Sequence, residues 1–150
     1  MTTVTTPLTA AAAVGSGLIA GLFFMCSVAL MPALARIHRS AAIASMQSIN
    51  TVIVRPLFLL VFLGTAAACG ALALLDPEPT HVVAAACYLV GVIGVTAAAN
   101  VPLNNALDRV RADGDDGAEL WPRYLSRWTA WNHVRTVAGT IATLVLVLAG

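Results

Sequence analysis

Charged residues are scarce in this chain, and lysine is absent. Only 10% of the 150 residues are charged, whereas 59% are hydrophobic; a soluble domain averages about 25% charged residues. All eight basic residues are arginines, and most of them lie near acids or at the ends of apolar runs. A nucleic-acid-binding surface needs a stripe of basic residues, which this pattern excludes. The composition is that of a membrane protein.

Motifs that hold metals or cofactors are also missing. The three cysteines, Cys26, Cys69 and Cys87, lie in apolar runs without C-x-x-C spacing, and we interpret them as small buried hydrophobic residues. The three histidines are far apart in the sequence, and the Glu-x-x-His motifs of a di-metal bundle do not occur. A glycine-rich phosphate loop is absent too. We therefore expect no bound metal and no cofactor.

Four apolar runs are long enough to cross a bilayer, which takes about 20 helical residues. They predict an all-α, integral membrane four-helix bundle. Residues 1–150 would form a single domain, with spans at about 9–34, 54–75, 82–100 and 130–149. The first run lacks the basic start of a signal peptide and exceeds its usual length, which indicates a retained membrane helix. After it, apolar residues recur at helical spacing and predict a helix that Pro56 kinks near the membrane surface.

Arginines are concentrated in two of the connections between these spans. The N-terminus and the short turn "DPEPT" have none, whereas the two long connections carry Arg36, Arg39, Arg55, Arg109, Arg111, Arg123 and Arg127. Basic residues mark cytoplasmic loops. We therefore expect both long connections in the cytoplasm and both termini on the extracytoplasmic side of a bacterial plasma membrane.

Polar side chains gather at the ends of the apolar runs on the predicted cytoplasmic side. Gln47 and Asn50 are three residues apart and share a helix face, as do Asn100 and Asn104, which are four apart. The fourth span opens with Trp128, Trp131, Asn132, His133 and Arg135. Polar groups at membrane depth usually face the bundle interior or a cavity. Their concentration at one end predicts a site there, near the cytoplasmic face.

Each of these residues also has a purely structural interpretation. The tryptophans are compatible with an aromatic belt at the membrane surface, and the asparagines with hydrogen bonds that join neighbouring helices. Arg135 is compatible with snorkelling to the lipid headgroups. A ligand site predicts an apolar cavity with these groups in its wall, whereas the structural interpretation predicts a closed amide network.

Two proline-containing segments resemble each other. The stretches "ALMPALAR" and "ANVPLNNALDR" each place a proline, Pro32 or Pro102, where a span leaves the membrane, and an arginine follows. The likeness is either a trace of two related helix pairs or a coincidence.

Three segments together resemble the anthrone oxygenase family of small four-span membrane proteins. They are "MQSIN", "NVPLNNAL" and "WPRYLSRWTAWNHVRT", and the shared positions are Asn100, Pro102, Asn104, Trp128, Trp131, Asn132, Arg135 and Thr136. The resemblance implies a membrane monooxygenase of polyketide chemistry. Such an enzyme oxidises an anthrone-like polycyclic aromatic to a quinone with O₂ and without a cofactor.

Anthrone chemistry needs a base, donors for an oxyanion and a flat apolar pocket. We expect His133 to act as the base, Arg135 to stabilise the enolate, and Asn132 to assist them as a third catalytic residue. Trp128 and Trp131 would wall the ring system. The remaining substrate contacts are expected from Asn100, Asn104, Gln47 and Asn50.

His133 lies about 100° around the helix from Asn132, so the base is either His133 or, if its ring faces away, water or the ionised substrate itself. The expected partners are a hydrophobic aromatic molecule, O₂, the lipid bilayer and a second copy of the chain, but no nucleic acid. The alternative function is non-enzymatic: a membrane protein that binds a lipid, a quinone or a partner subunit through the same polar cluster.

Overall fold

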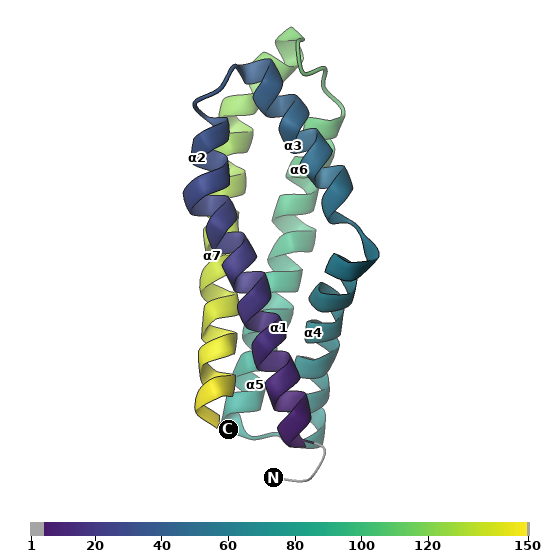
Figure 1. Cartoon of the computed structure of the whole chain (residues 1–150), viewed down its shortest axis with the longest axis vertical. Coiled ribbons are helices and arrows are strands. Elements are labelled where there is room, and N and C mark those ends of the chain that lie inside the picture. Colours follow the sequence, from purple (N-terminus) through teal and green to yellow (C-terminus); the bar gives the residue numbers. More distant parts are fainter. Residues whose placement is uncertain (1–4, 150) are drawn as a thin grey trace.

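The protein is a bundle of four long helical segments, as a computed structural model that describes residues 5–149 shows (Figure 1). The described part of the chain has no strands, so the predicted all-α fold is confirmed. Its elements, in chain order, are α1 (Thr5–Met25), the π-helical turn η1 (Cys26–Leu30), α2 (Met31–Leu34), α3 (Arg39–Ile53), α4 (Pro56–Leu75), α5 (Pro79–Ala86), the π-helical segments η2 (Cys87–Gly94) and η3 (Thr96–Asn100), α6 (Val101–Asp108) and α7 (Asp115–Ala149).

Four segments of the described chain are long and apolar enough to cross a membrane. They are Thr5–Leu34, Pro56–Leu75, Pro79–Asp108 and Asp115–Leu148. The third and fourth run further than the predicted spans, because the amide-rich and tryptophan-rich stretches continue the helices. Helix α4 has 20 residues, which at about 1.5 Å per residue matches the hydrocarbon thickness of about 30 Å. The other segments are longer and project beyond it at one end.

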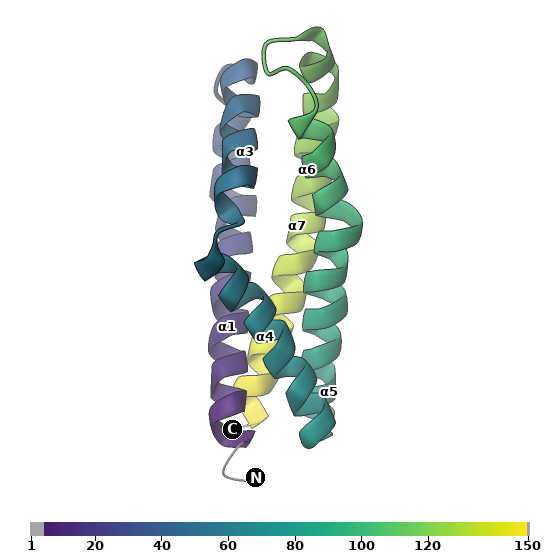
Figure 2. The same ribbon diagram turned by 90° about the vertical axis from the view of Figure 1, so that its right-hand side faces the viewer.

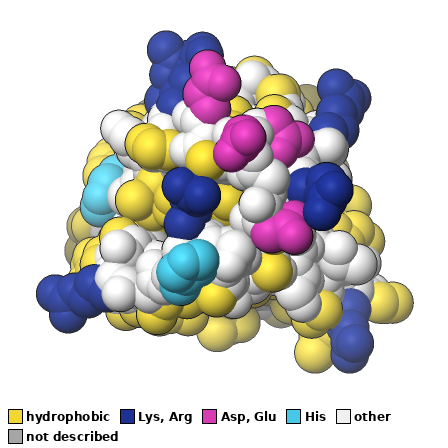
Figure 3. Space-filling model, turned by 90° about the horizontal axis from the view of Figure 1, so that it is seen from above, with side chains coloured by type: hydrophobic (Ala, Val, Ile, Leu, Met, Phe, Trp, Pro, Cys, Tyr) yellow, Lys and Arg dark blue, Asp and Glu magenta, His cyan; other side chains and the backbone are white. Residues whose placement is uncertain are grey.

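The two ends of the bundle differ in charge. The described chain begins at Thr5 and ends at Ala149 at one end of the bundle, and the two long connections lie together at the other (Figure 1). Seen from above, the end with the long connections carries arginine side chains around its rim and acidic side chains between them (Figure 3). The start of α1 and the end of α7 therefore share a side, and the assignment of that side as extracytoplasmic stays a prediction from the arginines.

A break separates α3 from α4, where the sequence predicts a kink at Pro56. Helix α3 ends at Ile53, and Arg55 is extended with φ −87° and ψ 155°. A proline disfavours helical backbone in the residue before it and favours the first position of a new helix. Val54 and Arg55 are therefore not helical, and α3 and α4 run in different directions (Figure 2).

The two echoing prolines produce the same local structure. Each follows a π-helical turn, η1 before Pro32 and η3 before Pro102. Proline has no backbone N–H, so the carbonyl four residues earlier loses its partner and the hydrogen bonds rearrange into a wider turn. Such turns are frequent at functional sites, and both of these border the cavity described below.

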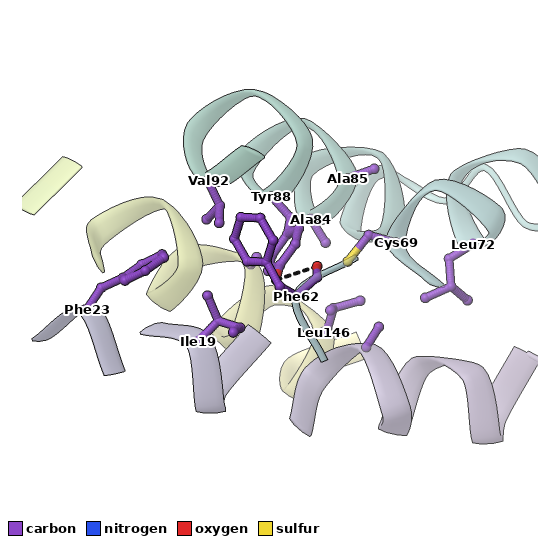
Figure 4. Packing of buried hydrophobic residues seen from close by; sticks show 12 residues of the cluster. Ile19, Phe23, Phe62, Cys69, Leu72, Ala84, Ala85, Tyr88, Val92 and Leu146 are labelled. Atoms are coloured by element: carbon purple, nitrogen blue, oxygen red, sulfur yellow. Dashed lines mark hydrogen bonds between the residues drawn. The ribbon is translucent and has the colours of Figure 1, made fainter. Parts of the chain in front are cut away.

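The bundle has two hydrophobic cores, one above the other. The lower core packs α1, α4, α5, η2 and α7 around residues such as Ile19, Phe62, Tyr88 and Leu146 (Figure 4). In it, the Tyr88 hydroxyl donates to the backbone carbonyl of Phe62 at 3.1 Å. The upper core joins α2, α3, α6 and the start of α7 and includes Met31, Ile43, Met46, Leu107, Trp121, Tyr124 and Trp128. The two cores leave a space between them at the level of the α3–α4 break.

Candidate functional site

A cavity of about 500 Å³ lies between the two cores. Its walls come from α1, η1, α3, the α3–α4 break, α4, η3, α6 and α7, and most of them are apolar side chains such as Leu22, Met46, Phe58 and Phe62. Polar residues of four elements also reach it: Thr96, Asn100, Asn104, Asn50 and Arg135. The splayed α3–α4 break creates the space, and the polar groups stand along one part of its wall.

Arg135 is a buried cation without a carboxylate partner. Its side chain is 5% exposed, and no acidic residue of the described chain pairs with it. Instead it donates to the Thr96 hydroxyl at 3.2 Å and to the Asn132 side-chain carbonyl. The guanidinium carbon lies 4.0 Å from the ring centre of Phe23 and 5.3 Å from that of Trp128. A buried charge is costly unless it is paired, and here hydrogen bonds and ring contacts take the place of a carboxylate.

Three polar atoms in the cavity wall are buried and have no hydrogen-bond partner. They are Nε of Arg135, Oδ1 of Asn100 and Nδ2 of Asn50. Asn100 is 1% exposed, and its other amide atom donates to the Trp128 carbonyl at 3.3 Å, which fixes its orientation. Most buried polar atoms in proteins are paired. The residues that line the cavity therefore include one charged donor, one neutral donor and one acceptor without a partner.

Asn104 and Asn132 are engaged within the protein. The Asn104 side-chain carbonyl accepts hydrogen bonds at 2.9 Å from the Tyr124 hydroxyl and from Trp128 Nε1. The Asn132 amide donates at 2.6 Å to both the Phe23 carbonyl and the Ser27 hydroxyl. Asn104 therefore holds Trp128 against the cavity, while Asn132 ties α7 to α1 and holds Arg135. For these two asparagines the geometry matches the interhelical interpretation.

Gln47 lies outside the cavity and closes the end of α6. Its amide donates to the backbone carbonyls of Leu107 and Val110 at 2.9 and 3.0 Å. The last carbonyls of a helix have no partner within it, so this side chain satisfies that of Leu107 and also binds the carbonyl of Val110 just beyond the helix. The side chain that was expected to contact the substrate thus joins α3 to α6.

His133 and Trp131 face away from the cavity. His133 lines a groove on the outer surface of the bundle together with Cys87 and Val137, and Trp131 is 44% exposed. Because α7 turns Asn132 inward, the next residue points about 100° away from it. The structure thus gives no geometric support to His133 as the base or to Trp131 as a cavity wall. Trp131 sits where an aromatic belt residue would.

Sequence reasoning missed several cavity residues on the first segment and on η3. Phe23 stacks on Arg135, Cys26 lines the cavity from η1, and Thr96 binds Arg135 from η3. The prolines that end these segments were the available signal, since each one places a π-helical turn next to the site. The ionisable side chains of the lining are Cys26 and Arg135; carboxylates and imidazoles are absent from it. Within residues 5–149, no three His, Cys, Asp or Glu side chains gather as a metal site would require.

Comparison with known protein families identifies the family of the chain. The profile of the family described as "Anthrone oxygenase" matches residues 48–145, from α3 to the last part of α7. This stretch includes Asn50, Asn100 and Arg135, which line the cavity and each have a buried side-chain atom without a hydrogen-bond partner. No curated protein and no solved structure matches the chain. The match covers about two thirds of the sequence, and the chain belongs to the anthrone oxygenase family.

Proposed function

We propose that the protein is a membrane monooxygenase that binds an anthrone-like polycyclic aromatic as an anion and oxidises it to a quinone with O₂. One observation carries the proposal: a buried arginine without a carboxylate partner borders an apolar cavity. Membership of the anthrone oxygenase family supports the reaction class.

The cavity suits such a ligand in size and polarity. Its volume of about 500 Å³ is within the range of roughly 300–1,000 Å³ for small-molecule sites. Phe23, Phe62 and Trp128 supply aromatic walls for a flat ring system. The enolate oxygen of the ligand would accept from Arg135, and a ring hydroxyl would donate to Oδ1 of Asn100.

The reaction needs no reductant. The methylene carbon of an anthrone loses a proton, and the resulting enolate passes one electron to O₂. The two radicals join, forming a carbon–oxygen bond, and protonation gives a hydroperoxide. Loss of the second methylene proton and cleavage of the O–O bond then yield the quinone carbonyl and water. One oxygen atom enters the product and the other leaves as water. The positive charge of Arg135 stabilises the enolate from which the electron departs.

In this proposal no protein side chain acts as the base, because the ligand is already ionised when it binds. With His133 on the outer surface, the lining contains neither imidazole nor carboxylate. A hydroxyanthrone that loses its methylene proton to water at the membrane surface, before it enters the cavity, would then bind as the anion that Arg135 favours. The pH dependence of the rate would follow the pKa of the substrate, so that anthrones of lower pKa would react at lower pH.

The absence of a base also favours a second function, reversible binding of a quinone or phenol without oxidation. The same cavity and the same arginine would serve it. The two functions differ in whether O₂ is consumed.

The test uses purified protein in phosphatidylcholine nanodiscs with a hydroxyanthrone and isotopically labelled O₂. The expected result is quinone formation faster than the spontaneous rate, with one O₂ consumed per quinone and one labelled atom in the product. Spontaneous-rate quinone formation together with saturable anthrone binding would instead establish the binding function. Absence of both would contradict the site.

A further inference from the structure

Exposed apolar side chains line the cavity at the α3–α4 break and at the start of α6. Among its lining residues, Val54 in the break is 60% exposed and Val101 at the start of α6 is 41% exposed, while Met25 at the end of α1 is 47% exposed. Figure 2 faces this side: α3 and α4 stand on one side, α6 on the other, and α7 is seen behind them. The two valines thus belong to opposite sides of the opening.

The opposite side of the break is walled. Leu22, Ile49, Ile53 and Phe58 line the cavity and also an outer groove between α1 and the break. These side chains therefore separate the two spaces. Arg55 and Val52 line the outer groove but not the cavity. The α3–α4 break thus borders the opening of the cavity on one side and a wall of side chains on the other.

The opening lies at the edge of the hydrocarbon layer. Helix α4 begins at Pro56 and by length crosses the hydrocarbon core alone, so the residues just before it lie at the membrane surface. The exposed lining residues of the break and of α6, Val54 and Val101, are both apolar. A mouth for water-dissolved ligands would be expected to carry polar groups at its rim, whereas an apolar rim at this depth favours molecules dissolved in lipid.

We propose that the ligand of the cavity enters laterally from the bilayer, between Val54 and Val101. Its class is then a flat, lipid-soluble aromatic with one acidic hydroxyl or enol, which leaves the lipid edgewise and meets Arg135 inside. The identity of this ligand rests on the proposed function. The route rests on the exposed apolar rim and on the wall at the opposite face.

Cys26 provides a native reporter for the route. It lines the cavity and is partly buried, whereas Cys69 is fully buried and Cys87 lines the outer groove beside His133. In a Cys69→Ala, Cys87→Ala background, the protein is placed in phosphatidylcholine vesicles, and the rate of Cys26 modification is measured. The probes are pyrenylmaleimide, which is flat and lipid-soluble, and a disulfonated maleimide, which stays in water.

Two matched substitutions test the opening. Val54→Trp narrows the mouth, and Val52→Trp places the same side chain in the outer groove two residues away. Val52 is 50% exposed and Val54 60%, so both variants change an exposed valine of the same segment. We expect Val54→Trp to slow modification by pyrenylmaleimide about tenfold or more and Val52→Trp by less than about twofold, because only the first obstructs access. Val101→Trp, from the opposite rim, should act like Val54→Trp.

Several outcomes would overturn the route. One is equal slowing by Val54→Trp and Val52→Trp when circular dichroism shows both variants folded. Another is modification by the disulfonated reagent as fast as by pyrenylmaleimide, which would mean access from water. Lack of pyrenylmaleimide reaction in the parent would mean that the cavity is closed to lipid. Labelling of Cys26 requires neither O₂ nor an anionic ligand, so its result stands apart from that of the oxidation assay.

Discussion

Replacement of Arg135 by methionine should separate ligand binding from stability. Arg135 is buried and has no carboxylate partner in the described chain, so the folded protein holds an uncompensated charge. Residues with that property usually serve a ligand rather than the fold. We expect Arg135→Met to lose affinity for an anionic aromatic while its unfolding free energy changes little.

The expected size follows from the contacts. Burial of the charge costs several kcal/mol. Hydrogen bonds from a charged group return about 1.5–3 kcal/mol each, and the rings of Phe23 and Trp128 return about 0.5–2 kcal/mol each. In the variant, Asn132 Oδ1 loses its donor, at about 1–3 kcal/mol, whereas the Thr96 hydroxyl keeps its bond to the Val92 carbonyl at 2.7 Å. These terms nearly cancel, so the net change should stay within about 2 kcal/mol.

Ligand affinity should respond much more strongly. A charge-assisted contact is worth about 1.5–3 kcal/mol, which corresponds to a loss of roughly 10- to 150-fold in dissociation constant. The probe is a dihydroxyanthraquinone, which ionises at a phenol and does not oxidise further. Binding is followed by its absorbance in nanodiscs, and stability by thermal unfolding in detergent.

Two control variants sharpen this test. Arg135→Lys keeps the charge and should retain part of the affinity. Asn132→Leu strands the Phe23 carbonyl and Ser27 hydroxyl that the amide now binds and should lower the unfolding free energy by about 1–3 kcal/mol. Unchanged affinity in Arg135→Met would refute the role of the arginine as counter-charge. A loss of stability larger than that of Asn132→Leu would show that it serves the fold.

Three further predictions concern other parts of the molecule. His133→Ala should leave oxidation or binding unchanged in the nanodisc assay, because the ring faces the outer groove; a large loss would restore its role as base. Gly91→Ala should destabilise the bundle by about 1–3 kcal/mol in thermal unfolding, because the added Cβ would overlap Ala138 of α7. The control Gly21→Ala places its Cβ in open space and should be neutral or stabilising. Equal effects of the two substitutions would contradict this packing. The Arg111 guanidinium lowers the pKa of the Asp113 carboxyl through a hydrogen bond and its charge, so any stability from this pair is present at neutral pH and is lost as acid protonates Asp113. Because both side chains are exposed, Asp113→Asn should leave the melting temperature at neutral pH unchanged.

The apolar runs by themselves determine the class of fold. A run of about 20 uncharged, apolar residues forms a helix that crosses a bilayer, because backbone groups in lipid must be paired within the helix. The break before Pro56 was predictable for an equally local reason, since the proline restricts the residue before it. The three motif segments were also sufficient for the family, to which residues 48–145 belong.

Only the tertiary structure decides which polar residues are available to a ligand. Asn104 and Asn132 share their residue type and setting with Asn50 and Asn100, yet the first two bind side chains or backbone of a neighbouring helix, whereas the second two each keep a buried side-chain atom without a hydrogen-bond partner. The same holds for His133, which is next to Asn132 in sequence but on another face. Asn132 meets Phe23, 109 residues away, and a hydrogen-bond partner at that distance is set by how helices pack. Sequence spacing orders side chains around one helix, whereas packing between helices determines which of them remain unpaired.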